Sequence, residues 1–74
     1  MNDFIKNFAD IFDETNLDEF TPNTRFRDLD EWSSLHAFAA LSMIELKYSI
    51  KLNAEEMKRK NTIQELFDLV MSKI

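Results

Sequence analysis

Hydrophobic side chains near the N-terminus follow the 3.6-residue period of an α-helix. The face that they define carries Phe4, Ile5, Phe8, Ile11 and Phe12. Asn2 precedes this run at a position where its side chain could accept a hydrogen bond from an amide of the first turn. The pattern therefore predicts an amphipathic helix over about residues 3–14, capped by Asn2.

Residues 15–32 lose this period and predict a long connection. They hold the only proline, Pro22, and turn-forming residues such as Asn16 and Asn23. So long a connection is unusual in a small domain, and we expect its own apolar side chains to hold it against the core. These side chains are Leu17, Phe20, Phe26 and Leu29.

A second helix is predicted from Ser34 to Tyr48. Its sequence is dominated by alanine and large apolar residues, and its only formal charges are Glu45 and Lys47. Because a helix that is apolar nearly all round is usually enclosed by other elements, we expect this helix to be mostly buried.

Two capping signals divide the C-terminal part of the chain. Asn53 with Glu56 three residues later has the form of a capping box and predicts a short helix through about Arg59, which Asn61 ends. Thr62 with Glu65 is a second box, which opens a helix that runs to the C-terminus. Its apolar face carries Ile63, Leu66, Phe67, Val70, Met71 and Ile74.

These segments predict an all-α fold, a small four-helix bundle of three long helices and one short one, with a long loop between helices one and two. A chain of 74 residues builds one hydrophobic core, so we expect a single domain over residues 1–74. A two-domain enzyme is excluded.

The composition argues against several classes of function. With 9 Lys and Arg against 14 Asp and Glu, the formal net charge of −5 disfavours binding to nucleic acid or to anionic membranes. The absence of cysteine and glycine excludes cysteine nucleophiles, thiolate metal sites and glycine-dependent nucleotide loops. No stretch has the form of a signal peptide or a membrane span, so we expect a cytoplasmic protein without membrane insertion. The sequence has no cluster of metal-ligating residues, so we expect no metal site.

Two adjacent serines, Ser33 and Ser34, begin the second helix. One serine would cap the helix, which leaves the other hydroxyl beside unpaired amides, a position that favours a phosphate ester. Serine-hydrolase chemistry is disfavoured, because the only histidine, His36, is poorly spaced along the helix to act as a base. We expect His36 on the surface in its neutral form, with contact to a phosphate as the alternative.

The order of helices, the acidic first loop and the motif Trp32-Ser33-Ser34-Leu35 together resemble an acyl carrier protein or a related phosphopantetheine-binding carrier domain. The resemblance covers nearly the whole chain. In that family, a Ser followed by Leu at the start of the second helix is esterified to 4'-phosphopantetheine, and Ser34 is the matching position. The residue before it is commonly Asp in the family and is Ser33 here, so attachment at Ser33 is the alternative.

The resemblance implies a carrier and not an enzyme. A phosphopantetheinyl transferase would supply the arm from coenzyme A, and its thiol would carry acyl or related groups as thioesters to separate acyl-loading and biosynthetic enzymes. Fatty acid or polyketide synthesis in a bacterium is the implied setting, and we expect a monomer. The short third helix would close over an apolar cleft, with Leu52 and Met57 lining this lid.

Further residues are expected at the cofactor and partner surfaces. Trp32 and Leu35 are expected to contact the arm. The expected partner surface consists of Asp28, Asp30, Glu31, Leu35, Met43, Glu45 and Leu46. We interpret the basic run 58–60 as a solvated helix end, with docking as the alternative. The alternative function is an unmodified helical interaction module, a degenerate carrier whose cleft binds a partner's amphipathic helix.

Overall fold

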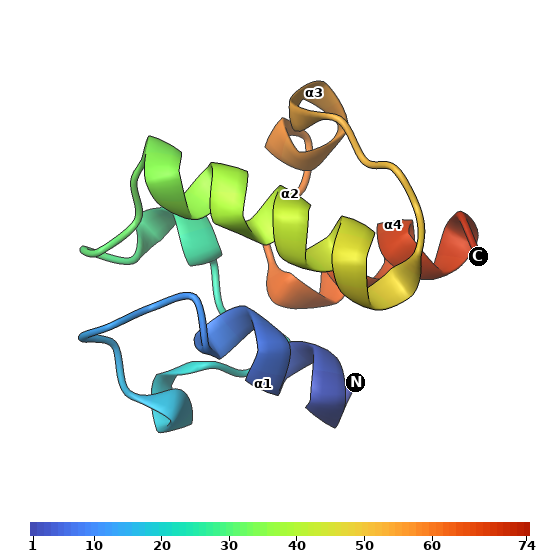
Figure 1. Ribbon diagram of the computed structural model, residues 1–74. Coiled ribbons are helices and arrows are strands. Elements are labelled where there is room, and N and C mark those ends of the chain that lie inside the picture. Colours follow the sequence, from blue (N-terminus) through green and yellow to red (C-terminus); the bar gives the residue numbers. More distant parts are fainter.

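Four α-helices and two short 3₁₀ turns make up the computed structural model, which describes residues 1–74 (Figure 1). Their bounds are α1 Asn2–Ala9, η1 Leu17–Glu19, η2 Phe26–Asp28, α2 Ser34–Tyr48, α3 Ala54–Lys58 and α4 Ile63–Ser72. There is no β-strand, and the predicted all-α bundle is confirmed. The long α2 crosses the molecule and contacts both α1 and α3.

Helix α1 is shorter than predicted. It ends at Ala9, and the expected cap by Asn2 is wrong, because Met1 occupies the cap position and no side chain caps the helix. Beyond Ala9 the chain tightens into i→i−3 hydrogen bonds, from Ile11 N to Phe8 O and from Phe12 N to Ala9 O. This tighter turn still delivers Phe12 to the core.

The long first connection is held by its apolar residues, as expected, with one exception. Phe20 and Phe26 are buried and Leu29 packs partly against the core, whereas Leu17 is 56% exposed. The connection also completes the start of α4: the carbonyl of Thr24 accepts a hydrogen bond from Ile63 N at 3.1 Å, and that of Pro22 accepts one from Gln64 N at 2.9 Å. Two orphan amides of a helix start are thereby satisfied by the loop.

The expectation that α2 is mostly buried is wrong. Its only fully buried side chains are Ala40 and Ile44, while Leu35, Phe38 and Leu46 are 79%, 71% and 80% exposed. The other helices cover part of its circumference, and so the remaining face meets solvent despite its apolar composition. Ser49 ends α2 in the left-handed conformation, with φ of 55°.

Both predicted C-terminal caps are present. The Asn53 side chain accepts from Glu56 N at 2.8 Å, and the Glu56 carboxylate accepts from Asn53 N at 3.3 Å, which completes the capping box of α3. At α4, Thr62 Oγ1 accepts a hydrogen bond from Glu65 N. The Glu65 carboxylate accepts one from the amide of Asn61, whereas in a standard capping box it would accept from the amide of Thr62. The last helix stops at Ser72.

Stacked and edge-on aromatic rings fill the centre of the core. Phe8 is completely buried, and its ring lies 5.5 Å from that of Phe26 and 5.6 Å from that of Phe12. The indole ring of Trp32 stacks on the Phe8 ring, with the two centroids 6.3 Å apart. Phe8 therefore joins α1, the first connection and the start of α2.

We predict that Phe8→Ala destabilises the fold by about 3–5 kcal/mol, because it removes the central ring and leaves a cavity. Phe38→Ala is the matched control, since this ring is largely exposed on α2 and its loss changes stability by less than about 0.5 kcal/mol. Urea unfolding followed by circular dichroism measures both values. Equal losses of stability in the two variants would contradict this description of the core.

Candidate functional site

The two serines at the start of α2 have different roles in the structure. Ser33 occupies the N-cap position with an extended backbone, and Ser34 is the first helical residue and is exposed. The expected side-chain cap is absent, because Ser33 Oγ is hydrogen-bonded to His36 Nδ1 at 2.8 Å. The amides of residues 34–36 consequently have no hydrogen-bond acceptor within the protein.

A cavity of about 310 Å³ lies beside these serines, between the start of α2 and the short helix α3. Its lining consists of Arg27, Trp32, Ser33, Ser34, Ala37, Ala54, Met57 and Lys58. Trp32, Ala37 and Met57 give it an apolar wall, and Arg27 and Lys58 add positive charge. Such a cavity next to an exposed hydroxyl suits a ligand with both an apolar and an anionic part.

Two basic residues at this cavity were not among the expected site residues. Arg27 donates to the carbonyl of Met57 at 3.2 Å and to Asn61 Oδ1 at 2.6 Å, which ties η2 to α3. Lys58, interpreted from the sequence as part of a solvated run, lines the cavity and lies 3.7 Å from Glu55. Neither position has a sequence signal, because both depend on how α3 packs on the first connection.

Of the predicted lid residues, Met57 lies within α3 and Leu52 lies in the chain that precedes it. Met57 and Leu52 are both buried, and Met57 alone of the two lines the cavity. A second polar contact holds α3 on its other side, where Lys73 Nζ lies 2.6 Å from Glu56 Oε2. This hydrogen bond, together with that from Asn53 N, lowers the pKa of Glu56.

Trp32 both packs in the core and lines the cavity. Its indole ring is edge-on to Phe26 at 5.2 Å and stacked on Phe12 at 6.2 Å, and the same side chain forms part of the cavity wall. Trp32 can therefore anchor the loop in the core and cover a ligand in the cavity from one position.

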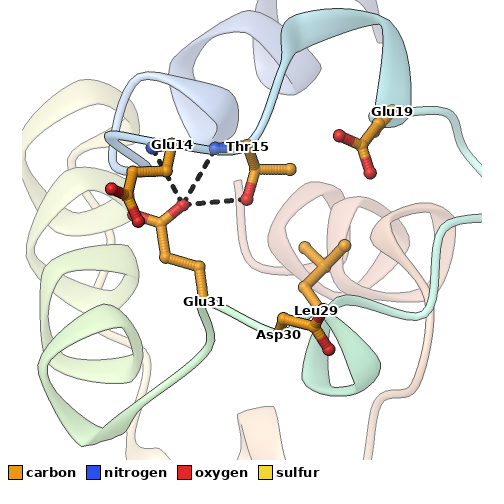
Figure 2. A pocket seen from close by; sticks show the side chains of 6 residues that line it. All are labelled: Glu14, Thr15, Glu19, Leu29, Asp30 and Glu31. Carbon is orange, nitrogen blue, oxygen red and sulfur yellow. Dashed lines mark hydrogen bonds between the residues drawn. The ribbon is translucent and has the colours of Figure 1, made fainter.

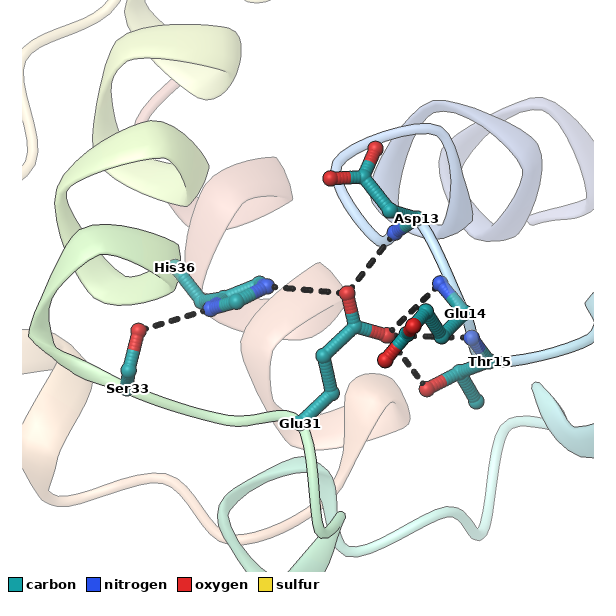
Figure 3. A network of polar contacts seen from close by, with 6 residues as sticks. All are labelled: Asp13, Glu14, Thr15, Glu31, Ser33 and His36. Carbon is teal, nitrogen blue, oxygen red and sulfur yellow. Dashed lines mark hydrogen bonds and ion pairs between the residues drawn. The ribbon is translucent and has the colours of Figure 1, made fainter.

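The carboxylate of Glu31 is bound by the chain that follows α1 (Figure 3). It accepts hydrogen bonds from the backbone amides of residues 13, 14 and 15 at 2.8 to 3.1 Å and from Thr15 Oγ1 at 2.8 Å. Partial desolvation raises the pKa of Glu31, but the hydrogen bonds from Asp13 N, Thr15 and Glu14 N outweigh it and lower the pKa to about 2. Glu31, expected in the partner surface, is thus engaged within the protein.

His36 is enclosed by other side chains, and its expected surface position is wrong. Its side chain is 17% exposed, its ring stacks on Phe12 with centroids 4.8 Å apart, and Nε2 lies 3.4 Å from Glu31 Oε2. The structure therefore brings Glu31, His36 and Ser33 into one polar chain (Figure 3).

An acidic hollow of about 290 Å³ lies on the first connection, next to Glu31 (Figure 2). Its lining consists of Glu14, Thr15, Glu19, Leu29, Asp30 and Glu31. The acidic side chains do not converge as metal ligands do, and the structure contains no group of three or more such ligands. The hollow gives this end of the molecule a negative surface, to which exposed Asp28 and Asp30 also contribute.

Three of the expected partner residues of α2 lie on its solvent side, whereas the fourth, Met43, packs partly against the core. Leu35 and Leu46 are largely exposed, Glu45 is exposed and Met43 is partly buried. Phe38 joins this face, and the sequence interpretation did not include it in the partner surface. Its spacing of three residues from Leu35 was the available signal.

Comparison of the chain with protein-family models, with curated proteins and with solved structures gives no match. None of the helices has the length and apolar character that crossing a membrane requires.

We predict that Glu31→Gln reduces the stability of the fold at neutral pH and weakens its dependence on pH. The pKa of Glu31 in the folded protein, about 2, lies below its ordinary value of 4.5, so its contribution is complete above about pH 4.5 and disappears as the pH falls toward 2. Urea unfolding at several pH values measures this dependence. Glu45→Gln, which changes an exposed glutamate on α2, is the matched control and should retain the wild-type profile.

Proposed function

We propose that this protein is an acyl carrier protein, which bears 4'-phosphopantetheine on Ser34 and delivers acyl or related thioesters to separate biosynthetic enzymes. The observation that carries the proposal is the position of Ser34, an exposed hydroxyl at the uncapped start of a 15-residue helix, beside a cavity with an apolar wall and basic residues. The resemblance of Trp32-Ser33-Ser34-Leu35 and of the helix order to carrier domains supports the same assignment.

The residues around Ser34 fit a phosphodiester. The amides of residues 34–36 have no acceptor in the protein, and the positive end of the helix dipole favours an anion there. Arg27 and Lys58 add positive charge at the cavity beside Ser34. A phosphate ester on the Ser34 hydroxyl would therefore be stabilised by the local charge.

The arm would supply a thiol, which a chain without cysteine lacks. The protein would shelter the attached group with its own apolar side chains. Trp32, Ala37 and Met57 line the cavity next to Ser34, and α3 above it is held by the hydrogen bonds of Arg27 and by the Lys73–Glu56 ion pair. Because these contacts are polar and at least partly exposed, α3 could separate from α2 to admit a longer acyl chain.

The surface around Ser34 suits docking to enzymes with basic and apolar patches. Leu35 is adjacent to Ser34 and largely exposed, and Asp28 and Asp30 lie on the preceding loop. The net charge of −5 would speed encounter with a basic partner. The proposed partners are a phosphopantetheinyl transferase and the enzymes that load and use the acyl group, in a bacterial cytoplasm.

We predict that incubation with coenzyme A, magnesium and a transferase of broad specificity adds one phosphopantetheine group to the protein, as measured by intact mass. Ser34→Ala should abolish the addition, and Ser33→Ala, the matched control at the neighbouring hydroxyl, should retain it. Peptide mapping identifies the modified serine.

Modification of Ser34→Ala but not of Ser33→Ala would move the attachment to Ser33. Failure to modify the wild-type chain in its native host as well as in vitro would refute the carrier function. Partner binding that persists unchanged in unmodified Ser34→Ala would favour the helical interaction module instead.

We predict further that Leu35→Ala lowers kcat/KM for attachment of the arm by about tenfold, which corresponds to loss of much of the burial energy of one leucine at the enzyme interface. Stability should not change, because this side chain is largely exposed. Leu17→Ala removes an exposed leucine from η1 instead and should leave the rate unchanged. Equal rates for the two variants would exclude Leu35 from the docking surface.

A further inference from the structure

A second chemical site, formed by Ser33, His36 and Glu31, lies beside Ser34 and has no part in the proposed function. Ser33 Oγ lies 2.8 Å from His36 Nδ1, and His36 Nε2 lies 3.4 Å from Glu31 Oε2 (Figure 3). A hydroxyl, an imidazole and a carboxylate in this order are the groups through which a histidine activates a serine. His36 follows Ser34 by two residues, a spacing that is poor for a base, whereas Ser33 precedes His36 by three residues and reaches it.

Glu31 determines which nitrogen of the neutral His36 ring carries the hydrogen. Its carboxylate is ionised at neutral pH, because its pKa lies at about 2, and an ionised carboxylate only accepts hydrogen bonds. Nε2, which faces Glu31, therefore carries the hydrogen. Nδ1 is left with a free electron pair and accepts the hydrogen of the Ser33 hydroxyl.

Packing restricts the orientation of the imidazole ring. The Phe12 ring stacks on the His36 ring with the centroids 4.8 Å apart, and the centroid of the Trp32 ring lies 6.2 Å from that of His36. Glu31 is itself fixed by the amides of residues 13–15. The base is thus held in place, while Ser33 at the helix start is exposed to reagents.

The surroundings of Ser33 are also suited to binding an acyl group. Ser33 lines the cavity whose apolar wall contains Trp32, Ala37 and Met57. The unpaired amides of residues 34–36 are donors for an oxygen that becomes negatively charged. A nucleophile, a base, amide donors and an apolar cavity therefore occur within one turn of the start of α2.

We propose that Ser33 is an acyl acceptor, which takes a short apolar acyl group from an activated ester or thioester. Ser33 Oγ forms a bond to the carbonyl carbon of the donor, and the bond from that carbon to its leaving oxygen or sulfur breaks. The Ser33 proton passes to His36 Nδ1 and then to the leaving group. Ser33 and His36 are the catalytic residues, and Glu31 is a positioning residue.

The test uses the unmodified 74-residue chain and p-nitrophenyl butyrate. We expect release of one p-nitrophenolate per chain and a butyryl ester on Ser33, located by tandem mass spectrometry. Ser33→Ala should abolish this ester, and His36→Gln should slow its formation by about 100-fold. Ser42→Ala, which removes an exposed hydroxyl from α2 away from the cavity, is the matched control and should react at the wild-type rate.

A further measurement keeps the test independent of folding in the His36→Gln variant. In ¹⁵N NMR spectra the His36 ring should show hydrogen on Nε2, and Glu31→Gln should shift the ring toward the Nδ1-protonated form and slow acylation, with circular dichroism confirming the fold.

Absence of a Ser33 ester or equal labelling of Ser33 and Ser34 would overturn the proposal. Its failure is distinguishable from that of the carrier function. The carrier function is measured as phosphopantetheine mass added to Ser34, whereas this proposal is measured as a butyryl ester on Ser33 of the unmodified chain.

Discussion

The arrangement around the candidate site depends on one bound carboxylate. After α1 the backbone amides of residues 13–15 point at Glu31, and its two oxygens accept all three, together with the Thr15 hydroxyl. These bonds bring the end of the first helix to the start of the second across the long connection. Glu31 Oε2 also lies 3.4 Å from His36 Nε2, and His36 Nδ1 is hydrogen-bonded to Ser33 Oγ, so Glu31 and His36 connect the serine pair to residues 13–15.

The caps of the last two helices and the helical class of the fold were predictable from short stretches of sequence. The caps at Asn53 and Thr62 require only residues three positions apart, and both are present. The helical fold follows from periodicity in the same way. The course of the chain after Ala9 was not predictable, because it turns first into i→i−3 hydrogen bonds and then presents the amides of residues 13–15 to Glu31, which lies far along the chain.

In the candidate site too, the features set by neighbouring residues were predictable and those set by distant contacts were not. Exposure of Ser34 at a helix start follows from local sequence, but the engagement of Ser33 with His36 does not, because capping is the commoner role for a serine there. The basic residues at the cavity depend on the contact between η2 and α3. The exposed face of α2 was misjudged because apolar composition reveals neither how many neighbours a helix has nor which side they cover.

The backbone bonds from Pro22 and Thr24 to the first turn of α4 make the last helix dependent on the first connection. Neither segment can complete its hydrogen bonding alone, so both should order in a single cooperative step that requires closure of a long loop. Folding of this small helical chain should therefore be slower than its helix content suggests, since its rate is set by contacts of high sequence separation.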